Sequence, residues 1–306
     1  LFIIELYLTF FLKPIRIEDI HKKFSKNEKF ELDLRTRKEF YLDEKKINPE
    51  IVVSVSSDNF ISKDKKFIPL SAISNKETIS CNESGQFKKY FSDRYGFNNP
   101  DKMWDKKEID FLILGDSFAH GDCVLEENNF AGNLRKISKK NTINLGYGGN
   151  GPIRSLAALQ EYVDLIKVKN IVWMYYEGND AQNYIFEKKN QILNNYILDE
   201  NFKQNLYLKQ KKINELIYTT IDQELDARKV NFNVKNLIKL NATRRLFLSK
   251  TTQEINLNGH FFKIFERAAL IANKKKANFY VFMIPSAEKL YGNKDYSQSE
   301  KIKKEL

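Results

Sequence analysis

Three short apolar runs, each ending in a loop of glycine and polar residues, constrain the fold of this 306-residue chain more than any other feature. The runs are residues 111–114, 142–145 and 170–176, and segments with apolar residues at helical spacing separate them. A fourth run, 279–284, follows another such segment. Strands and helices that alternate at this length pair in parallel through right-handed crossovers. We therefore predict a three-layer α/β/α domain with a mostly parallel, flavodoxin-like sheet.

The polar loops after the first three strands are expected at the same edge of the sheet. They contain Gly115-Asp116-Ser117, the glycine cluster 146–151 and Gly178-Asn179-Asp180. An open parallel sheet gathers its ligand at the carboxyl ends of its strands, near the point where the strand order reverses. We therefore predict that Ser117, Gly149 and Asn179 lie together in one cleft.

The first loop presents a candidate nucleophile. Gly115 permits a tight turn, Asp116 can accept hydrogen bonds from backbone N–H groups, and Ser117 is left with its hydroxyl pointing outward. A serine that attacks an ester needs donors for the oxyanion that develops and a base for its proton. Taken alone, the tripeptide also fits an ordinary turn that caps a helix.

The three loops in this order resemble the SGNH or GDSL-type esterase and lipase superfamily, over roughly residues 110–180 and more weakly 279–285. The resemblance implies that Ser117 is the nucleophile, that Gly149 supplies a backbone N–H to the oxyanion hole and that Asn179 supplies a side-chain amide. Gly146 or Gly148 is the alternative backbone donor. It also implies a serine esterase that forms an acyl-serine intermediate, acting on acylated glycans or lipids, or an O-acyltransferase of the same fold. Neither a cofactor nor a metal is expected.

The catalytic base is where the sequence departs from the family. The family places Asp-x-x-His near its C-terminus, and this sequence has no such motif. Its histidines are His21, His120 and His260. His120 follows the candidate nucleophile by three residues. Asp19-Ile20-His21 resembles an Asp-x-His pair of alginate O-acetyltransferase-like relatives. We expect the base and its aspartate beyond Leu306, in a gene that continues for about 30 to 80 residues.

Charge and cysteine content exclude several other classes. The chain has 51 Lys and Arg against 40 Asp and Glu, a formal charge of +11, but the lysines are scattered, and no nucleic-acid-binding module is present. Cys81 and Cys123 are its two cysteines. Their spacing indicates neither a zinc site nor a disulfide framework, and it leaves a single bridge between them open.

The chain divides into three parts. Residues 1–14 fit the end of a membrane anchor, because Leu1–Leu12 is almost wholly apolar, although an ordinary buried strand or helix fits as well. Residues 15–108 form an accessory region with one strand candidate at 51–55, and 109–306 form the SGNH-like domain with a largely helical insertion at 181–258. An anchored protein of this kind would be extracytoplasmic, while a soluble cytoplasmic protein stays open.

Two other function classes compete with ester chemistry. A non-catalytic glycan-binding or assembly protein could keep the sheet and its polar loops without a working base, and the missing Asp-x-x-His favours it. The pairing of Ser117 with Asn179 disfavours it, because binding alone does not require that pair. A flavodoxin-like nucleotide binder is disfavoured because the glycine cluster has neither Gly-x-Gly-x-x-Gly after a first strand nor a P-loop lysine.

Overall fold

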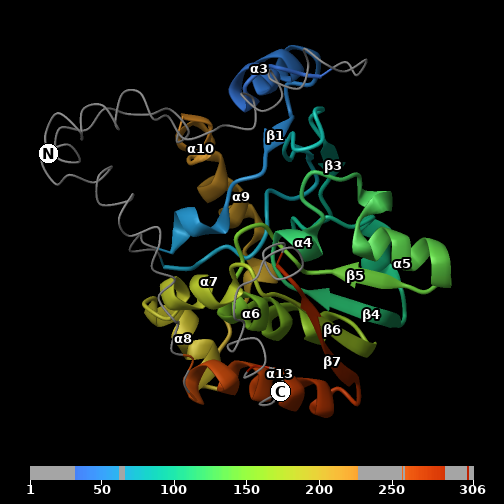
Figure 1. The fold of residues 1–306 in the computed structure, drawn as a ribbon, viewed down its shortest axis with the longest axis vertical. Coiled ribbons are helices and arrows are strands. Elements are labelled where there is room, and N and C mark those ends of the chain that lie inside the picture. Colours follow the sequence, from blue (N-terminus) through green and yellow to red (C-terminus); the bar gives the residue numbers. More distant parts are fainter. Residues whose placement is uncertain (1–31, 62–65, 227–256, 258, 287–301, 303–306) are drawn as a thin grey trace, which may run out of the picture.

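A four-stranded parallel sheet forms the centre of the molecule (Figure 1). The structure is a computed structural model, and it describes residues 32–61, 66–226, 257, 259–286 and 302. The strands are β4 (Ile109–Leu114), β5 (Thr142–Asn144), β6 (Val168–Tyr176) and β7 (Asn278–Ile284), in the order β5-β4-β6-β7. Every neighbouring pair is parallel, so the four predicted core strands and their parallel pairing are confirmed.

Helices cover both faces of this sheet. Alternate residues of a strand point to opposite faces, and accordingly Ile113 and Met174 pack toward α5 (Phe130–Ser138). Leu112 and Trp173 belong to the larger cluster that includes α6 (Pro152–Tyr162) and α13 (Gly259–Lys274). The architecture is thus mixed α/β and compatible with a three-layer α/β/α fold.

The strand order reverses at β4. From β4 the chain passes to β5 on one side, and it then returns to β6 on the other side. Right-handed crossovers in opposite directions place their helices on opposite faces, which is where α5 and α6 are found. The carboxyl end of β4 therefore lies at the switch point, where an open α/β sheet leaves a crevice.

The accessory region builds a second, smaller sheet. Its elements are α3 (Arg37–Ile47), β1 (Val52–Val53), η1 (Ser57–Phe60), β2 (Glu77–Ile79), β3 (Lys89–Phe91) and η2 (Asp101–Asp105). Strand β1 pairs in parallel with β2, and β2 pairs antiparallel with β3. The strand predicted at 51–55 is therefore present in shortened form. Apolar residues of this region join the same buried cluster as α6 and the main sheet, for example through the edge-to-face rings of Phe97 and Tyr162 at 5.0 Å.

A buried aspartate fixes the turn-rich segment before β4. The carboxylate of Asp93 accepts hydrogen bonds from the backbone N–H groups of Tyr95 and Phe97, each at 2.9 Å. It also accepts from the Asn99 amide at 2.9 Å and from the Trp104 indole at 2.7 Å. Because four donors converge on one side chain, the segment keeps a single shape although it has little regular secondary structure.

The predicted insertion is helical over its described part. It contains α7 (Asp180–Glu187), α8 (Gln191–Leu198), η5 (Leu206–Leu208), α9 (Gln210–Tyr218) and α10 (Ile221–Asp226), and residues 227–256 lie outside the described part. Helix α10 packs against α3 of the accessory region (Figure 1). Glu224 makes this contact: it lies 3.5 Å from Arg37 and accepts a 2.5 Å hydrogen bond from Asn59.

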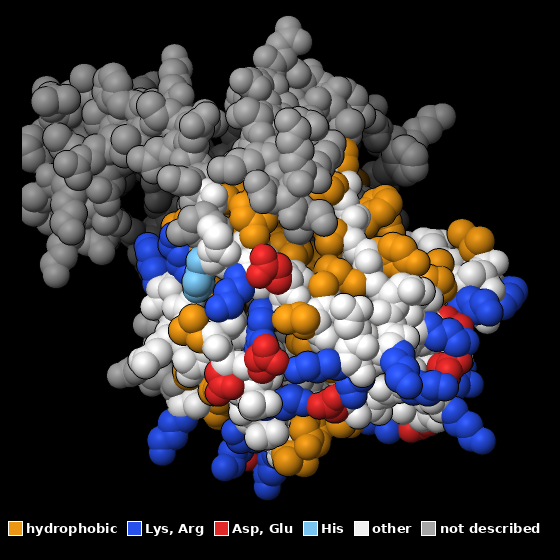
Figure 2. All heavy atoms as spheres, turned by 90° about the horizontal axis from the view of Figure 1, so that it is seen from below, with side chains coloured by type: hydrophobic (Ala, Val, Ile, Leu, Met, Phe, Trp, Pro, Cys, Tyr) orange, Lys and Arg blue, Asp and Glu red, His pale blue; other side chains and the backbone are white. Residues whose placement is uncertain are grey.

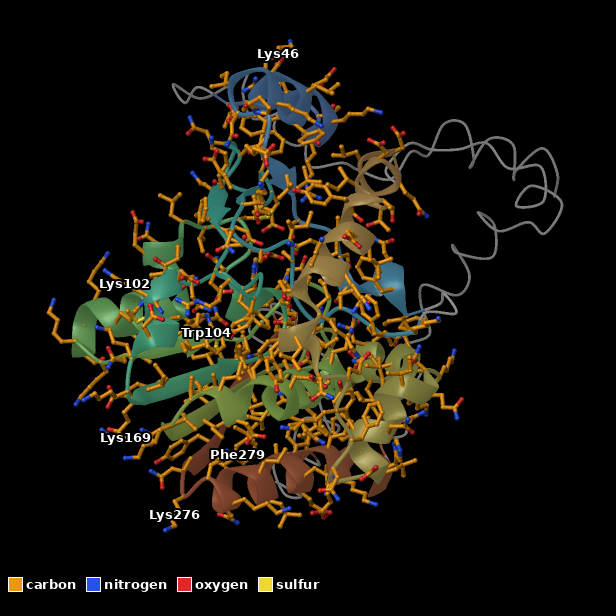
Figure 3. All side chains as sticks on the ribbon, turned by 180° about the vertical axis from the view of Figure 1, so that it is seen from behind. Lys46, Lys102, Trp104, Lys169, Lys276 and Phe279 are labelled. Atoms are coloured by element: carbon orange, nitrogen blue, oxygen red, sulfur yellow. A yellow bond between two sulfur atoms is a disulfide. The ribbon has the colours of Figure 1, made fainter. Side chains whose placement is uncertain are left out.

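Charged side chains are dispersed over the surface. Figure 2 shows a face on which Lys and Arg are mixed with Asp and Glu. In Figure 3 the labelled lysines Lys46, Lys102, Lys169 and Lys276 lie at separate places on the periphery. Within the residues that the structure describes, no helix is both long and apolar enough to cross a bilayer. The segment predicted as the end of an anchor, 1–14, lies outside those residues.

Candidate functional site

The candidate nucleophile begins a single helical turn directly after β4. Helix α4 (Ser117–His120) has Asp116 as its N-cap, whose Oδ1 accepts the Phe118 N–H at 2.9 Å. Gly121 ends the turn with a φ of 77°, a left-handed conformation that favours glycine. The sequence motif therefore folds as the predicted turn, and Ser117 is only half-buried at its start.

Close backbone approaches explain two glycines of the site. Gly115 has a φ of +145°, and a Cβ there would lie 2.6 Å from the Met174 carbonyl oxygen on β6. A Cβ on Gly146 would lie 2.8 Å from the His120 backbone nitrogen. The turn after β4 is thus packed between the ends of the two neighbouring strands.

The glycine cluster is tied to that turn by hydrogen bonds. Tyr147 donates its N–H to the Gly115 carbonyl at 3.2 Å. Asn144, the buried last residue of β5, donates its amide to the Ala119 carbonyl at 2.6 Å and accepts the Gly146 N–H at 2.8 Å. The Gly146 N–H is therefore occupied, which removes it as an alternative oxyanion donor.

Two backbone N–H groups of the cluster remain available. Within the described residues, the N–H groups of Gly148 and Gly149 donate no hydrogen bond. Gly149 has a φ of +85°, and its carbonyl accepts a hydrogen bond from the Arg154 guanidinium. This contact turns the Gly149 carbonyl toward Arg154 and fixes the position of the loop.

A buried ion pair holds the far side of the glycine cluster. Arg154 and Glu187 are both fully buried, with 2.5 Å between Nε and Oε1. Glu187 also accepts the N–H groups of Gly151 at 2.7 Å and Ile153 at 2.8 Å, so it satisfies the start of α6. Burial raises the pKa of Glu187, and the Arg154 charge opposes that shift. No local sequence pattern marks this pair.

The third predicted loop lies beside the first. Asn179 is the N-cap residue of α7 at the end of β6. Burial raises the pKa of Asp116 to about 6, and a side-chain hydrogen bond from Asn179 opposes that rise. The next residue, Asp180, is buried and accepts the Tyr176 N–H at 2.9 Å. The rings of Phe118 and Tyr176 add a contact between the two loops, with centroids 4.2 Å apart.

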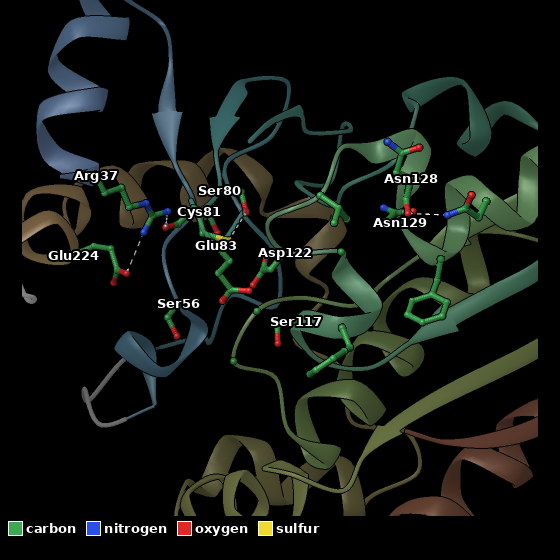
Figure 4. A pocket seen from close by; sticks show the side chains of 18 residues that line it. Arg37, Ser56, Ser80, Cys81, Glu83, Ser117, Asp122, Asn128, Asn129 and Glu224 are labelled. Atoms are coloured by element: carbon green, nitrogen blue, oxygen red, sulfur yellow. Dashed lines mark hydrogen bonds and ion pairs between the residues drawn. The ribbon is translucent and has the colours of Figure 1, made fainter. Parts of the chain in front are cut away.

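A cavity of about 670 Å³ opens at Ser117 (Figure 4). Gly148 and Gly149 line it together with Ser117, so two of the three predicted site residues share one cavity. Asn179 is not among the lining residues, although it lies next to Asp116. The oxyanion roles of Gly149 and Asn179 stay predictions.

Much of the cavity wall comes from outside the main sheet. Figure 4 shows Arg37, Ser56, Ser80, Cys81 and Glu83 of the accessory region facing the nucleophile loop, with Glu224 of the insertion beside Arg37. Arg37 donates to the backbone carbonyls of Ser54 and Ile79 at 2.6 and 3.1 Å. Sequence reasoning missed these residues, because no local motif marks them.

A disulfide joins the accessory wall to the nucleophile loop. Cys81 and Cys123, 42 residues apart, are bonded, with their Cα atoms 4.9 Å apart. The bridge that the sequence left open is therefore formed. Cys123 lies six residues after Ser117, so the bond fixes the loop that follows α4 against β2 and its turn.

Neither described histidine forms a hydrogen bond with the hydroxyl of the candidate nucleophile. His120 is buried, with its Nδ1 2.6 Å from Asp122 Oδ1, and its ring packs edge-on against Tyr90 and Tyr147. His260 contacts the Tyr184 hydroxyl at 3.0 Å, and burial lowers its pKa. His21 lies outside the described residues. The predicted need for a base from elsewhere is unchanged.

The part of the chain that the structure describes contains no group of three or more His, Cys, Asp or Glu side chains that could hold a metal ion. A scan of the sequence against protein-family models and a search of curated proteins found no match.

Proposed function

We propose that this protein is a serine esterase, or an acyltransferase of the same fold, with Ser117 as its nucleophile. One observation carries the proposal: Ser117 is half-buried at the carboxyl end of β4, at the switch point of a parallel sheet, and lines a cavity with Gly149. The finer assignment to the SGNH-type superfamily belongs to the same proposal and rests on the sequence motifs.

In the proposed reaction, the Ser117 hydroxyl oxygen attacks the carbonyl carbon of an ester. The base takes the serine proton, the carbon–oxygen bond to the alcohol breaks, and the base returns the proton to the departing alcohol. The N–H of Gly149 and the amide of Asn179 donate to the oxyanion, and each such donor contributes a few kcal/mol when it is preorganised. Water or an acceptor hydroxyl then takes the acyl group from the serine.

The base in this scheme is a histidine that lies outside the described residues. Ser117 needs it because a serine hydroxyl is a weak nucleophile at neutral pH. His21 of this chain is one candidate.

The disulfide supports an extracytoplasmic location, which we include in the proposal. Disulfides such as Cys81–Cys123 form and persist in oxidising compartments and are rare in the cytosol. Acylated glycans and lipids are the ester substrates that such a location offers. The membrane anchor is a separate part of the proposal, and it rests on the sequence of residues 1–14 alone.

The proposal is tested by covalent labelling of the full-length gene product with a fluorophosphonate, which reacts with activated serines. We expect labelling and hydrolysis of short-chain aryl esters, and we expect Ser117→Ala to abolish both. Asn179→Ala should lower kcat by about 10²-fold, as loss of one oxyanion donor does. Ser138→Ala is the matched control, because Ser138 ends α5 and does not line the cavity.

Two outcomes would separate the competing classes. Labelling that survives in the Ser117→Ala variant would contradict the nucleophile assignment. A folded full-length protein that neither hydrolyses esters nor reacts with the fluorophosphonate would favour the non-catalytic glycan-binding class. That class has one observation in its support, namely that the described residues bring no base to Ser117.

A further inference from the structure

The accessory region holds the glycine cluster at several points. The Tyr147 hydroxyl donates to the Val55 carbonyl at 2.7 Å. The Ser57 hydroxyl lies 3.2 Å from both the Gly148 carbonyl and Asn150 Oδ1, and it can donate to either. Tyr147 and Ser57 are each 1% exposed, so bulk water does not compete for these bonds. The position of the glycine cluster therefore depends on a segment 91 to 93 residues away in the sequence.

Arg154 adds a second tie between the same two segments. Its guanidinium donates to the Ser57 hydroxyl oxygen, to Asp58 Oδ1 at 2.8 Å and to the Gly149 carbonyl. The ion pair with Glu187 holds the guanidinium in place from the other side. Ser57 thus accepts from Arg154 and donates to the glycine cluster, which uses both capacities of its hydroxyl.

The contact between Ser57 and Gly148 sets the direction of the next N–H group. A peptide group is planar and trans, so its C=O and its N–H point in opposite directions. Because the Gly148 carbonyl points to Ser57, the Gly149 N–H points away from Ser57. Gly149 lines the cavity with Ser117, and within the described part of the chain its N–H donates no hydrogen bond.

Close packing leaves the Gly149 peptide little freedom to turn. Gly149 has a φ of +85°, and a Cβ there would lie 2.8 Å from Ser56 Oγ and 3.3 Å from Ser57 Oγ. Ser56 itself lines the cavity, and in Figure 4 it lies across that cavity from Ser117. Residues 56–58 therefore border the cavity and also fix the loop beside it.

We propose that Ser57 and Arg154 are positioning residues of the oxyanion hole, which hold the carbonyls of Gly148 and Gly149 so that the Gly149 N–H is aimed at the developing oxyanion. Neither residue touches a reacting atom. A donor that is already in place stabilises the oxyanion more than one that must first turn. The accessory region is then a working part of the active site. This inference rests on the proposed function.

Ser57→Ala in the full-length gene product tests the role. Alanine leaves the Gly148 carbonyl without its side-chain donor, so the Gly149 N–H is no longer held. We expect kcat for a short-chain aryl ester to fall about tenfold or more while KM changes less than about threefold, because the oxyanion forms only after the substrate is bound. The inhibition constant of a boronic acid, which forms a tetrahedral adduct with serine, should rise by the factor by which kcat/KM falls.

Ser92→Ala is the matched control. Ser92 is also a fully buried serine of the accessory region, its hydroxyl lies 2.7 Å from the Ile73 carbonyl, and it does not line the cavity. We expect this variant to lower the urea unfolding midpoint about as much as Ser57→Ala, with kcat within about twofold of wild type. An equal fall of kcat in the two variants, or a change in KM alone for Ser57→Ala, would overturn the positioning role.

Tyr147→Phe provides a milder variant if Ser57→Ala does not fold. It removes the hydroxyl that holds the Val55 carbonyl and keeps the ring. We expect kcat to fall about threefold or more at unchanged KM. Unchanged kcat in this variant would contradict the idea that the accessory region aims the N–H of Gly149.

Amide hydrogen exchange separates a failure of this inference from a failure of the proposed function. Ser57→Ala should raise exchange across residues 146–151 about tenfold or more, whereas Ser92→Ala should not. If the wild type neither hydrolyses esters nor reacts with a fluorophosphonate, the oxyanion role falls together with the proposed function. If the wild type is active and the two variants show the same exchange across 146–151, the inference alone is wrong.

Discussion

Gly115 is a residue at which the geometry of the Gly115-Asp116-Ser117 turn is tightly constrained. Its φ of +145° and the 2.6 Å approach of the Met174 carbonyl leave no room for a side chain. We predict that Gly115→Ala lowers the free energy of unfolding by about 2 kcal/mol or more and displaces Ser117. Urea unfolding measures the first effect and fluorophosphonate labelling the second.

Gly259 provides the comparison for that variant. It is the first residue of α13, and a Cβ there would meet nothing within 4 Å. Gly259→Ala should change stability by less than about 0.5 kcal/mol, because alanine is the better helix former. Equal losses in the two variants would contradict the steric account of Gly115.

The Arg154–Glu187 pair yields a second prediction at this scale. Glu187→Gln removes the anion that faces a fully buried guanidinium, and loss of one partner of a buried pair costs about 3–5 kcal/mol. Removing the guanidinium as well, as in Arg154→Met with Glu187→Gln, should cost less than Glu187→Gln alone, because the Gln oxygen can still accept an N–H at the start of α6. A double-mutant cycle by chemical denaturation measures the difference, and a double variant that is the less stable would contradict it.

Local residue patterns could predict only part of the site. The Gly115-Asp116-Ser117 turn was predictable because its cap, its glycine and its serine are consecutive. Arg154 acts through a partner that the fold brings close, namely Glu187, 33 residues away, and Glu224 likewise binds Arg37 of the accessory region. One sequence cannot reveal such partners, because nothing in the local spacing marks them.

At the scale of elements, the apolar runs predicted the main sheet well. Strands β4, β5 and β6 each have at least two consecutive buried residues, which leaves a continuous apolar run in the sequence. Strand β7 has no fully buried residue, and the apolar run 279–284 alone made it predictable. Strands β2 and β3 have only three residues each and partly exposed positions, so they leave no comparable pattern. The parts of the cavity wall near them were missed for the same reason.

The contact between α3 and α10 allows a prediction about how these elements are held together. Glu224 is largely buried and binds both Arg37 and Asn59, whereas the Lys38–Asp226 pair on the same two helices is more exposed. We predict that Glu224→Gln costs about 1–2 kcal/mol and raises amide hydrogen exchange in both helices.

Asp226→Asn is the control at the same interface. An exposed pair contributes little after side-chain entropy and solvent screening, so its loss should change stability by less than about 0.5 kcal/mol. If Asp226→Asn loosened α10 as much as Glu224→Gln, burial would not be what distinguishes the two contacts.

At the scale of the whole molecule, one disulfide and one shared hydrophobic cluster hold the accessory region on the sheet. Closure of a loop of this length restricts the unfolded chain by about 4 kcal/mol in the chain-entropy estimate. We predict that Cys81→Ser with Cys123→Ser loses up to this amount but still folds, because the cluster remains. Urea unfolding with and without a reductant measures it, and wild type that is indifferent to reductant would contradict the prediction.

The same bond gives the chain a covalent ring. The ring consists of residues 81 to 123 closed by the disulfide, and it includes β3, η2, β4 and Ser117. A protease that cuts once anywhere between these cysteines produces a nicked molecule whose two pieces stay joined by the disulfide, with Ser117 still covalently linked to the accessory wall. Backbone cleavage and loss of the accessory region are thus separate events for this protein, and the second requires either a reductant or a further cut.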